Sequence, residues 1–458
     1  MVRRFDTLVI GGGMSGLPLA LRAARHGTTA FVERDLLGGT CLNRGCIPTK
    51  TMIASAKLAQ QVRRAGEFGV HADTPQVALS EVVDRKDTVV DSIRSGSYKA
   101  VGRSGDLELF EGHGRFIGHR RLEVDGTTIE ADRVFLNTGT RDALPAIDGL
   151  EQVDYLTSRT ILDLRELPAH LIVVGGGFIG VEFAQMFARF GAQVTVIQRG
   201  ERLLPGEDPA ISKVVTEAFR AEGIDVVTAT TCVAAERHED GVRVGCDGAE
   251  TGELIGSHLL IAAGRTPNTD DLGLEKLGLD LDDRGFVAVD GQLRTGVEDV
   301  WALGDLRGVD MFTHTARDDA EVAYRTVFKQ QQDATIADRV VPHAVFVDPE
   351  VASVGLTEQQ ARDAGHDVAT GTQRFEGVAK AKAIGETDGF VTFVTDAASD
   401  RILGCHIVGP EAGNLIHEAV IAMVADVPYR DIGRAIHIHP TLAEGVNAAA
   451  GGVHRPSA

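Results

Sequence analysis

The chain reads Thr7-Leu8-Val9-Ile10-Gly11-Gly12-Gly13-Met14-Ser15-Gly16 near its beginning. A helical stretch continues to His26-Gly27, and a second apolar run from Thr28 to Val32 ends at Glu33. This order predicts a strand, a glycine-rich turn, a helix and a second strand. Gly11, Gly13 and Gly16 have the GxGxxG spacing, which lets backbone N–H groups and a helix N-terminus approach a pyrophosphate. Because Glu33 is placed to bind a ribose, the sequence predicts a dinucleotide-binding unit rather than an ordinary tight turn.

The same pattern occurs again about 160 residues further on, which is too long a period for a solenoid. The run Leu171-Ile172-Val173-Val174 precedes Gly175, Gly177 and Gly180, and a helical stretch then reaches Phe190-Gly191. Each helix is expected to end at its glycine, Gly27 in the first copy and Gly191 in the second. The chain is therefore expected to contain two separate dinucleotide-binding domains.

The second copy differs from the first where its second strand ends. Gln198 stands where an NAD site has a carboxylate for the ribose 2′-hydroxyl, and Arg199 and Arg202 follow it. A neutral amide beside guanidinium groups favours a 2′-phosphate. We therefore predict NADPH in preference to NADH, with two solvated surface arginines as the alternative interpretation.

The segment from Gly38 to Lys50 carries Cys41 and Cys46, with four residues between them. A zinc site would need two further ligands, and the sequence has no second cysteine pair at suitable spacing. A buried structural pair would not need the glycine-rich lead-in. A helix that begins near Cys46, with Pro48 in its first turn, would favour a thiolate. A redox-active disulfide is therefore the preferred interpretation, and no metal site is predicted.

The last part of the chain has a different character. Strands are expected at Val341–Val347, Gly389–Val394 and Ile402–Val408, and a helix at Leu415–Val424. No glycine-rich phosphate loop occurs there. We therefore expect a third, α+β domain.

Composition limits the possible functions. The 458 residues are 43% hydrophobic and 24% charged, which is typical of a globular protein of about three domains. The formal net charge of −20 offers no basic face for nucleic acid or an anionic membrane. No apolar run approaches the roughly 18 residues of a membrane span. Five scattered cysteines and a strand-like N-terminus without room for a signal peptide favour a cytoplasmic enzyme.

Further motifs follow in a recognisable order. They are Asn137-Thr138-Gly139-Thr140, Ala263-Gly264-Arg265, Trp301-Ala302-Leu303-Gly304-Asp305, Met311-Phe312-Thr313-His314, and His439-Pro440-Thr441 with Glu444. Together with the two glycine-rich turns and the cysteine pair, they resemble the class I pyridine nucleotide-disulfide oxidoreductases over nearly the whole chain. That family includes dihydrolipoamide dehydrogenase, glutathione reductase and mercuric reductase.

The resemblance implies an α/β fold with two Rossmann-like domains, one for FAD and one for NAD(P), and a C-terminal α+β dimerisation domain. The expected limits are 1–147 with 267–335 for FAD, 148–266 for NAD(P) and 340–458 for dimerisation. The residues expected to hold FAD are Gly11, Gly13, Gly16, Glu33, Gly39, Thr40, Lys50, Gly114, Thr138, Gly139, Asp305, Met311, Thr313 and His314. Those expected to hold the nicotinamide nucleotide are Gly175, Gly177, Phe178, Gly180, Gln198, Arg199, Arg202, Val233 and Gly264, with Phe178 as a gate.

The resemblance also implies the electron path. Hydride from NADPH would reduce the flavin, and the flavin would reduce the Cys41–Cys46 disulfide. Cys46 would face the flavin as a thiolate, while Cys41 would attack the substrate disulfide. Lys50 and Glu182 would form an ion pair near the flavin.

His439, oriented by Glu444, is the candidate base, and in this family it reaches the active site of the partner subunit of a homodimer. Two structural alternatives remain from the residues alone. The alternation Ile436-His437-Ile438-His439 is what a strand would show, and Thr441-x-x-Glu444 is also a capping box. Cys232, Cys246 and Cys405 are interpreted as isolated core or surface thiols.

The substrate is the least determined part of the prediction. The stretches around Asn137 and Phe312 are most similar to mercuric-reductase-like proteins, whereas the C-terminal stretch is similar to dihydrolipoamide dehydrogenase. No extra cysteine pair follows Gly451, so efficient mercury reduction is not expected. We predict a lipoamide-like or other small disulfide as substrate. The alternatives are a flavin reductase of metal ions or quinones, and a non-catalytic redox sensor.

Overall fold

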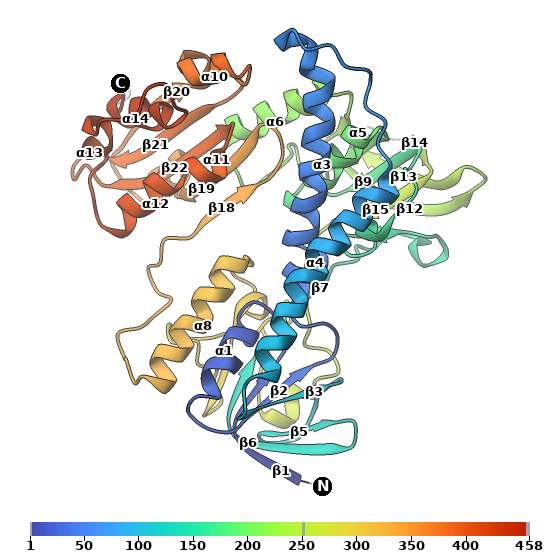
Figure 1. Ribbon diagram of the computed structural model, residues 1–458, viewed down its shortest axis with the longest axis vertical. Helices are drawn as coiled ribbons and strands as arrows, with labels where there is room; N and C mark the ends of the chain where they lie inside the picture. The colour runs from blue at the N-terminus through green and yellow to red at the C-terminus, as the bar shows by residue number, and fades with distance from the viewer. Residues whose placement is uncertain (1, 250–251, 455–458) are drawn as a thin grey trace.

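The computed structural model describes residues 2–249 and 252–454. Its strands form three large sheets, which lie in different parts of the molecule in Figure 1. The first sheet has the order β3-β2-β1-β6-β5-β4, and β17 pairs with β6. Its strands are β1 (Val2–Ile10), β2 (Thr29–Glu33), β3 (Leu107–Glu111), β4 (Arg115–Gly118), β5 (Arg121–Val124), β6 (Thr127–Leu136) and β17 (Val300–Ala302).

Helix α1 (Gly16–Ala23) connects β1 to β2, which pair in parallel, so the first predicted unit is confirmed. The helix does not end at Gly27, as its sequence predicted. It ends at Ala23, and its C-cap Ala24 keeps right-handed backbone angles, so no glycine is required there. Strand β17 pairs with β6 although it lies far along the chain. The first sheet therefore contains strands that precede the second sheet in the sequence and one strand that follows it.

The second sheet is fully parallel and has the order β11-β10-β9-β15-β8. Helix α5 (Phe178–Phe190) follows β9 and ends at Gly191, whose φ of 116° is left-handed, as predicted. The strands are β8 (Leu156–Thr157), β9 (His170–Val174), β10 (Gln193–Ile197), β11 (Asp225–Val227) and β15 (His258–Ile261), with α6 (Pro209–Ala221) between β10 and β11. An antiparallel sheet of β12 (Thr230–His238), β13 (Gly241–Gly248) and β14 (Gly252–Gly256) adjoins it.

The third sheet is antiparallel, with the order β18-β19-β22-β21-β20, which agrees with the expected α+β unit. Its strands are β18 (Pro342–Val345), β19 (Glu350–Gly355), β20 (Val368–Arg374), β21 (Phe390–Asp396) and β22 (Ile402–Gly409). The predicted helix at Leu415–Val424 is divided into α11 (Ala412–Leu415) and α12 (His417–Val424). Helices α13 (Tyr429–Arg434) and α14 (Ala443–Gly451) follow.

The helices α2 (Gly39–Arg44), α3 (Cys46–Arg64) and α4 (Leu79–Gly102) connect these units. Helix α3 packs on α4 and on α5, and α3 and α4 run through the middle of the molecule in Figure 1. Met52 of α3, Phe187 of α5 and Val351 of β19 belong to one buried core cluster. The start of α3 is therefore held between the second and third sheets, while α8 (Thr313–Phe328) packs on α1 beside the first.

Candidate active site

One cavity of about 1750 Å³ joins both glycine-rich turns and the cysteine pair. It is larger than the roughly 300–1,000 Å³ of an ordinary ligand pocket. Gly11 and Gly13 line it from the first turn, Gly175 and Gly177 from the second, and Cys41 with Cys46 between them. A single continuous space therefore connects the three motifs that the sequence placed far apart.

The first turn is built so that only glycine fits. A Cβ atom on Gly11 would lie 2.1 Å from the carbonyl oxygen of Asn137, and one on Gly16 would lie 2.0 Å from that of Gly11. The carboxylate of Glu33 accepts a hydrogen bond of 2.6 Å from the backbone N–H of Gly12. One side of the turn therefore packs closely against backbone atoms, and the other side faces the cavity. This arrangement suits a dinucleotide pyrophosphate.

The second turn repeats this geometry. A Cβ atom on Gly175 would lie 2.3 Å from the oxygen of Ala262, and one on Gly180 would lie 1.8 Å from that of Gly175. Oε1 of Gln198 accepts 2.9 Å from the N–H of Gly176, as Glu33 does in the first turn. Both turns therefore fit the pyrophosphate of a dinucleotide, and they differ in the charge of the residue at the strand end.

The two predicted arginines have different surroundings. Arg199 is exposed, with no side-chain bond among the described residues. The guanidinium of Arg202 donates to the backbone oxygens of Pro205, at 3.1 Å, and Glu207, at 3.4 Å. Arg199 is therefore the arginine that is free to meet a ligand, whereas Arg202 supports the following loop.

The cysteine pair stands where α2 meets α3. Cys46 is the first residue of α3, as predicted, and its sulfur lies 3.4 Å from the hydroxyl of Thr313. The pKa of Cys46 is lowered, chiefly by a hydrogen bond with Cys41 and further by Thr313 and Lys50, although burial opposes this. The same hydrogen bond and burial raise the pKa of Cys41. These opposite shifts favour Cys46 over Cys41 as the thiolate of a reduced pair, and a helix N-terminus at Cys46 would stabilise that charge further.

Lys50 and Glu182 form the expected ion pair. The Nζ atom of Lys50 lies 2.9 and 2.8 Å from the two carboxylate oxygens of Glu182. The backbone N–H of Phe346 donates to the same carboxylate at 3.0 Å, and the ring of Phe346 lies 4.6 Å from Nζ. The pair lines the cavity beside Cys46.

Most of the other predicted cofactor residues also line the cavity. They are Glu33, Gly39, Thr40, Gly114, Thr138, Gly139, Phe178, Gln198, Gly264, Asp305, Met311, Thr313 and His314. Burial raises the pKa of Asp305, whose carboxylate accepts 3.1 Å from the hydroxyl of Thr140. The predicted residues that do not line it are Gly16, Gly180, Arg199, Arg202, Val233, His439 and Glu444.

His439 lies in the loop between α13 and α14, outside the cavity of its own chain. Its Nδ1 lies 2.9 Å from Glu444, and this hydrogen bond lowers the pKa of the Glu444 carboxyl. The imidazole is 71% exposed, so Nε2 is available to another molecule.

Neither structural alternative for His439 and Glu444 explains the segment. The alternating His437-Ile438-His439 stretch forms no strand, and a cis peptide bond precedes Pro440. Half of the capping box exists, because the N–H of Thr441 donates to Glu444 at 2.9 Å. The other half is missing, because the N-cap of α14 is Leu442 and not Thr441, whose hydroxyl donates to the backbone oxygen of Ile438.

The three remaining cysteines are buried thiols without a disulfide, as interpreted, but two of them are neighbours and not isolated. Cys232 and Cys246 are buried and stand directly opposite each other on the antiparallel strands β12 and β13. Burial raises the pKa of both, so they are weak nucleophiles. The sequence could not show this pairing, because register depends on the hairpin between the strands. Cys405 is buried alone in the third sheet.

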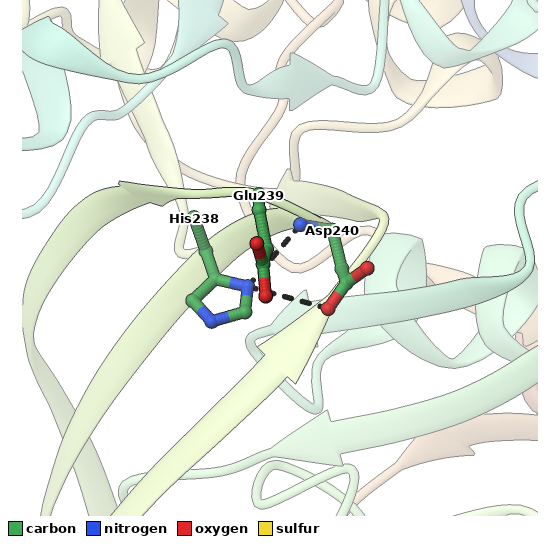
Figure 2. A group of neighbouring side chains, drawn as sticks. All are labelled: His238, Glu239 and Asp240. Carbon is green, nitrogen blue, oxygen red and sulfur yellow. Dashed lines mark hydrogen bonds and ion pairs between the residues drawn. The ribbon is translucent and has the colours of Figure 1, made fainter.

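A group of metal-binding type occurs at the turn between β12 and β13. Figure 2 shows His238, Glu239 and Asp240 there, with the N–H of Asp240 bonded to the imidazole at 3.2 Å. Glu239 and Asp240 are exposed, and acidic groups in an exposed turn are common without an ion. We assign no role to this group.

Several residues of the cavity wall carry no sequence signal. His343 and Phe346 come from β18 and the residues after it, and Glu207 from the loop before α6. They lie outside every motif, so only the folded chain places them beside the second turn. In the part of the chain that the structure describes, no helix is both long and apolar enough to cross a bilayer.

Comparison with known proteins agrees with this geometry. Residues 5–320 match the family described as pyridine nucleotide-disulphide oxidoreductase, and residues 341–450 match the dimerisation domain of that family. Dihydrolipoyl dehydrogenase of Haloferax volcanii is 39% identical over 97% of this chain and 95% of its own. Mercuric reductase of Bacillus cereus is 33% identical over 97% of this chain and 71% of its own. The structure of RclA from Escherichia coli, an HOCl-induced flavoprotein disulfide reductase, superposes with a TM-score of 0.89 at 30% identity, covering 97% of this chain and 99% of its own.

Proposed function

Because the chain belongs to the pyridine nucleotide-disulphide oxidoreductases, we propose that it reduces a small disulfide with electrons from NADPH. It is an FAD-dependent enzyme that takes its electrons from NAD(P)H. The observation that carries the proposal is the single cavity in which two dinucleotide turns flank Cys41 and Cys46. A lipoamide-like or other low-molecular-weight disulfide is the proposed substrate.

The proposed division of the chain follows the sheets. Residues 1–147 and 267–335 would hold FAD, because β17 joins the first sheet from beyond the second. Residues 148–266 would hold the nucleotide, with the uncharged Gln198 and the free Arg199 favouring NADPH. Residues 340–458 would form the dimer contact, and the exposed apolar side chains of Ile421, Val424, Ile436 and Ile438 would be covered by it.

Bound FAD supplies the transfer of hydride equivalents from the nucleotide to the disulfide. Because the pKa of Cys41 is raised, a base must remove its proton before it can attack, and the two cysteines then act in turn. Cys41 attacks one sulfur of the substrate disulfide, which forms a mixed disulfide and releases the first product thiol. Cys46, held as a thiolate at the start of α3, attacks the Cys41 sulfur, which releases the second thiol and restores the Cys41–Cys46 bond.

The proton balance requires a base near Cys41. We assign this role to His439 of the partner subunit, because the imidazole is exposed and lies outside its own cavity. Glu444 accepts from Nδ1 and so leaves Nε2 to take the Cys41 proton and to protonate a leaving thiolate. The free thiols and the absence of a disulfide framework support a reducing compartment such as the cytoplasm.

Anaerobic titration with NADPH, followed in the visible spectrum, tests the proposal. We expect a long-wavelength absorbance from the Cys46 thiolate beside the flavin after two-electron reduction. Cys46→Ser should abolish it, whereas Cys405→Ser, a buried cysteine outside the site, should retain it. A flavin that bleaches without this absorbance in the unaltered protein would contradict electron transfer through the cysteine pair, and would favour direct reduction of a metal ion or quinone.

A further inference from the structure

A buried carboxylate outside the predicted site holds an imidazole at the cavity wall. Oε1 of Glu207 lies 2.6 Å from Nε2 of His343, and Oε2 accepts 2.6 Å from the hydroxyl of Ser353. The Glu207 side chain is only 2% exposed. Burial by itself raises the pKa of this carboxyl, but the hydrogen bond and charge of His343 outweigh it, and the pKa is lowered. The lowered pKa favours the ionised carboxylate, to which His343 Nε2 would donate.

This contact joins two units of the fold. Glu207 lies in the loop after β10, on the side of the second glycine turn, whereas His343 and Ser353 lie directly opposite each other on β18 and β19. One carboxylate thus binds both members of a cross-strand pair. The orientation of the His343 ring is fixed by this arrangement and not by its own strand alone.

The oriented imidazole packs against two aromatic rings. Its centroid lies 5.4 Å from that of Phe178, the first residue of α5, with 22° between the ring planes. It lies 5.6 Å from that of Phe312, the N-cap of α8, with 5° between the planes. The rings of Phe178 and Phe312 are 6.2 Å apart, and all three residues line the cavity. Each ring therefore comes from a different unit and meets the others only through tertiary packing.

Phe178 is placed to control access to the second glycine turn. It follows Gly177 directly and is only partly buried, so its helix does not fix the direction of the ring by itself. Since His343 contacts it in a near-parallel stack, removal of the imidazole would leave Phe178 free to take other rotamers. A ring that moves into the cavity would occupy space that a nicotinamide ring needs.

We propose that His343, anchored by Glu207, is a positioning residue that holds Phe178 against Phe312 and thereby determines how a nicotinamide nucleotide enters the cavity. This inference rests on the proposed function and adds a specificity-determining contact from the third unit. His343 does not need to touch the reacting atoms, because it acts through Phe178.

Steady-state kinetics with NADPH varied, on the FAD-loaded enzyme, tests the proposal. His343→Ala should raise the KM for NADPH about fivefold and change kcat less than about twofold. His343→Phe should return the KM to within about twofold of the original, because a flat ring restores the stack without the imidazole. Glu207→Gln should give an intermediate KM, since the amide still accepts from His343 but has lost its charge. The KM for the disulfide should stay the same in all three variants.

His366→Phe is the matched control. This imidazole is also paired with a carboxylate, Asp396 at 3.4 Å, but it lies outside the cavity, so no KM should change. An unchanged KM for NADPH in His343→Ala, or a failure of His343→Phe to restore it at the original melting temperature and FAD content, would overturn the proposal. If His343→Ala does not retain FAD, His343→Gln replaces it, because it removes the ring and keeps a polar side chain.

The failure of this inference can be told from that of the proposed function. If the proposed function is wrong, NADPH will either leave the flavin of the unaltered protein oxidised or bleach it without the long-wavelength absorbance. If only the role of His343 is wrong, NADPH will reduce the flavin with the same concentration dependence in the unaltered protein and in His343→Ala.

Discussion

The ammonium group of Lys50 lies within 2.9 Å of both carboxylate oxygens of Glu182, one turn into the helix that begins at Cys46. The Glu182 side chain is 8% exposed, so the contact with Lys50 lies largely away from water. Lys50 lowers the pKa of Cys46, and Glu182 raises it. Lys50 and Glu182 therefore have opposite effects on the pKa of Cys46, and both side chains line the cavity.

Removal of the lysine should weaken the thiolate. In Lys50→Met the positive charge is lost and the negative one stays, so the pKa of Cys46 should rise. Below that pKa the thiol is protonated, and the ultraviolet thiolate absorbance of the reduced protein should appear at higher pH than in the unaltered chain. Turnover at neutral pH should fall about tenfold. Lys57→Met, on the same helix, should leave the titration unchanged, and an equal shift in both variants would contradict a local effect.

Substitutions in the two glycine turns should impair different cofactors, FAD in the first turn and the nicotinamide nucleotide in the second. Gly11→Ala places a Cβ 2.1 Å from the Asn137 oxygen, so the purified protein should lose most of its FAD, measured by its visible absorbance. Gly175→Ala places one 2.3 Å from the Ala262 oxygen, so FAD should stay while reduction by NADPH slows at least about tenfold. Gly96→Ala, where no atom lies within 4 Å, should do neither. Loss of FAD in Gly175→Ala would mean that the two turns are not independent.

The nucleotide preference should depend on Arg199. Reversal of its charge in Arg199→Glu should repel a 2′-phosphate and lower the NADPH/NADH ratio of kcat/KM about tenfold or more. The same change at the exposed Arg103 should leave the ratio as it is. A ratio that Arg199→Glu does not alter would show that this arginine is only a solvated surface residue.

Mixed dimers should show whether the base comes from the partner subunit. Cys41→Ser and His439→Gln homodimers should each be inactive. After their subunits are exchanged, one site of every mixed dimer combines an intact cysteine with an intact histidine, so about a quarter of the original activity should return. If each active site were made from one chain alone, no activity would return after the exchange. A tag on one variant shows that the subunits have exchanged.

Stability should depend on pH through Glu350, which lines the cavity. Burial raises the pKa of this carboxyl to about 7, above its ordinary value of 4.5. The protonated form is favoured in the folded chain, so its contribution to stability is complete below about pH 4.5 and is lost as the pH rises through 7. We therefore expect the difference in melting temperature between Glu350→Gln and the unaltered protein to shift in favour of the variant as the pH rises from 4.5 to about 7. The exposed Glu298→Gln should show no such trend.

The local features of the site could be predicted because short-range geometry determines them. The turn at Gly11–Gly16, the start of α3 at Cys46 and the C-cap at Gly191 each depend on neighbouring residues and on the conformations that glycine and helix ends allow. The Glu33 and Gln198 contacts with their turns follow from the same strand–turn–helix spacing. At the end of α1 the prediction from one glycine was wrong, because the helix ends at Ala23 with a right-handed C-cap that needs no glycine.

The two dinucleotide turns, the cysteine pair and the family follow from the sequence alone, because these are encoded in runs of a few adjacent residues. Folding of the whole chain was needed to show that both turns open into one cavity, that Cys232 faces Cys246, and that Glu207 holds His343 against Phe178. His343 lies 136 residues from Glu207. Such contacts depend on how whole sheets pack, and no spacing within one segment specifies them.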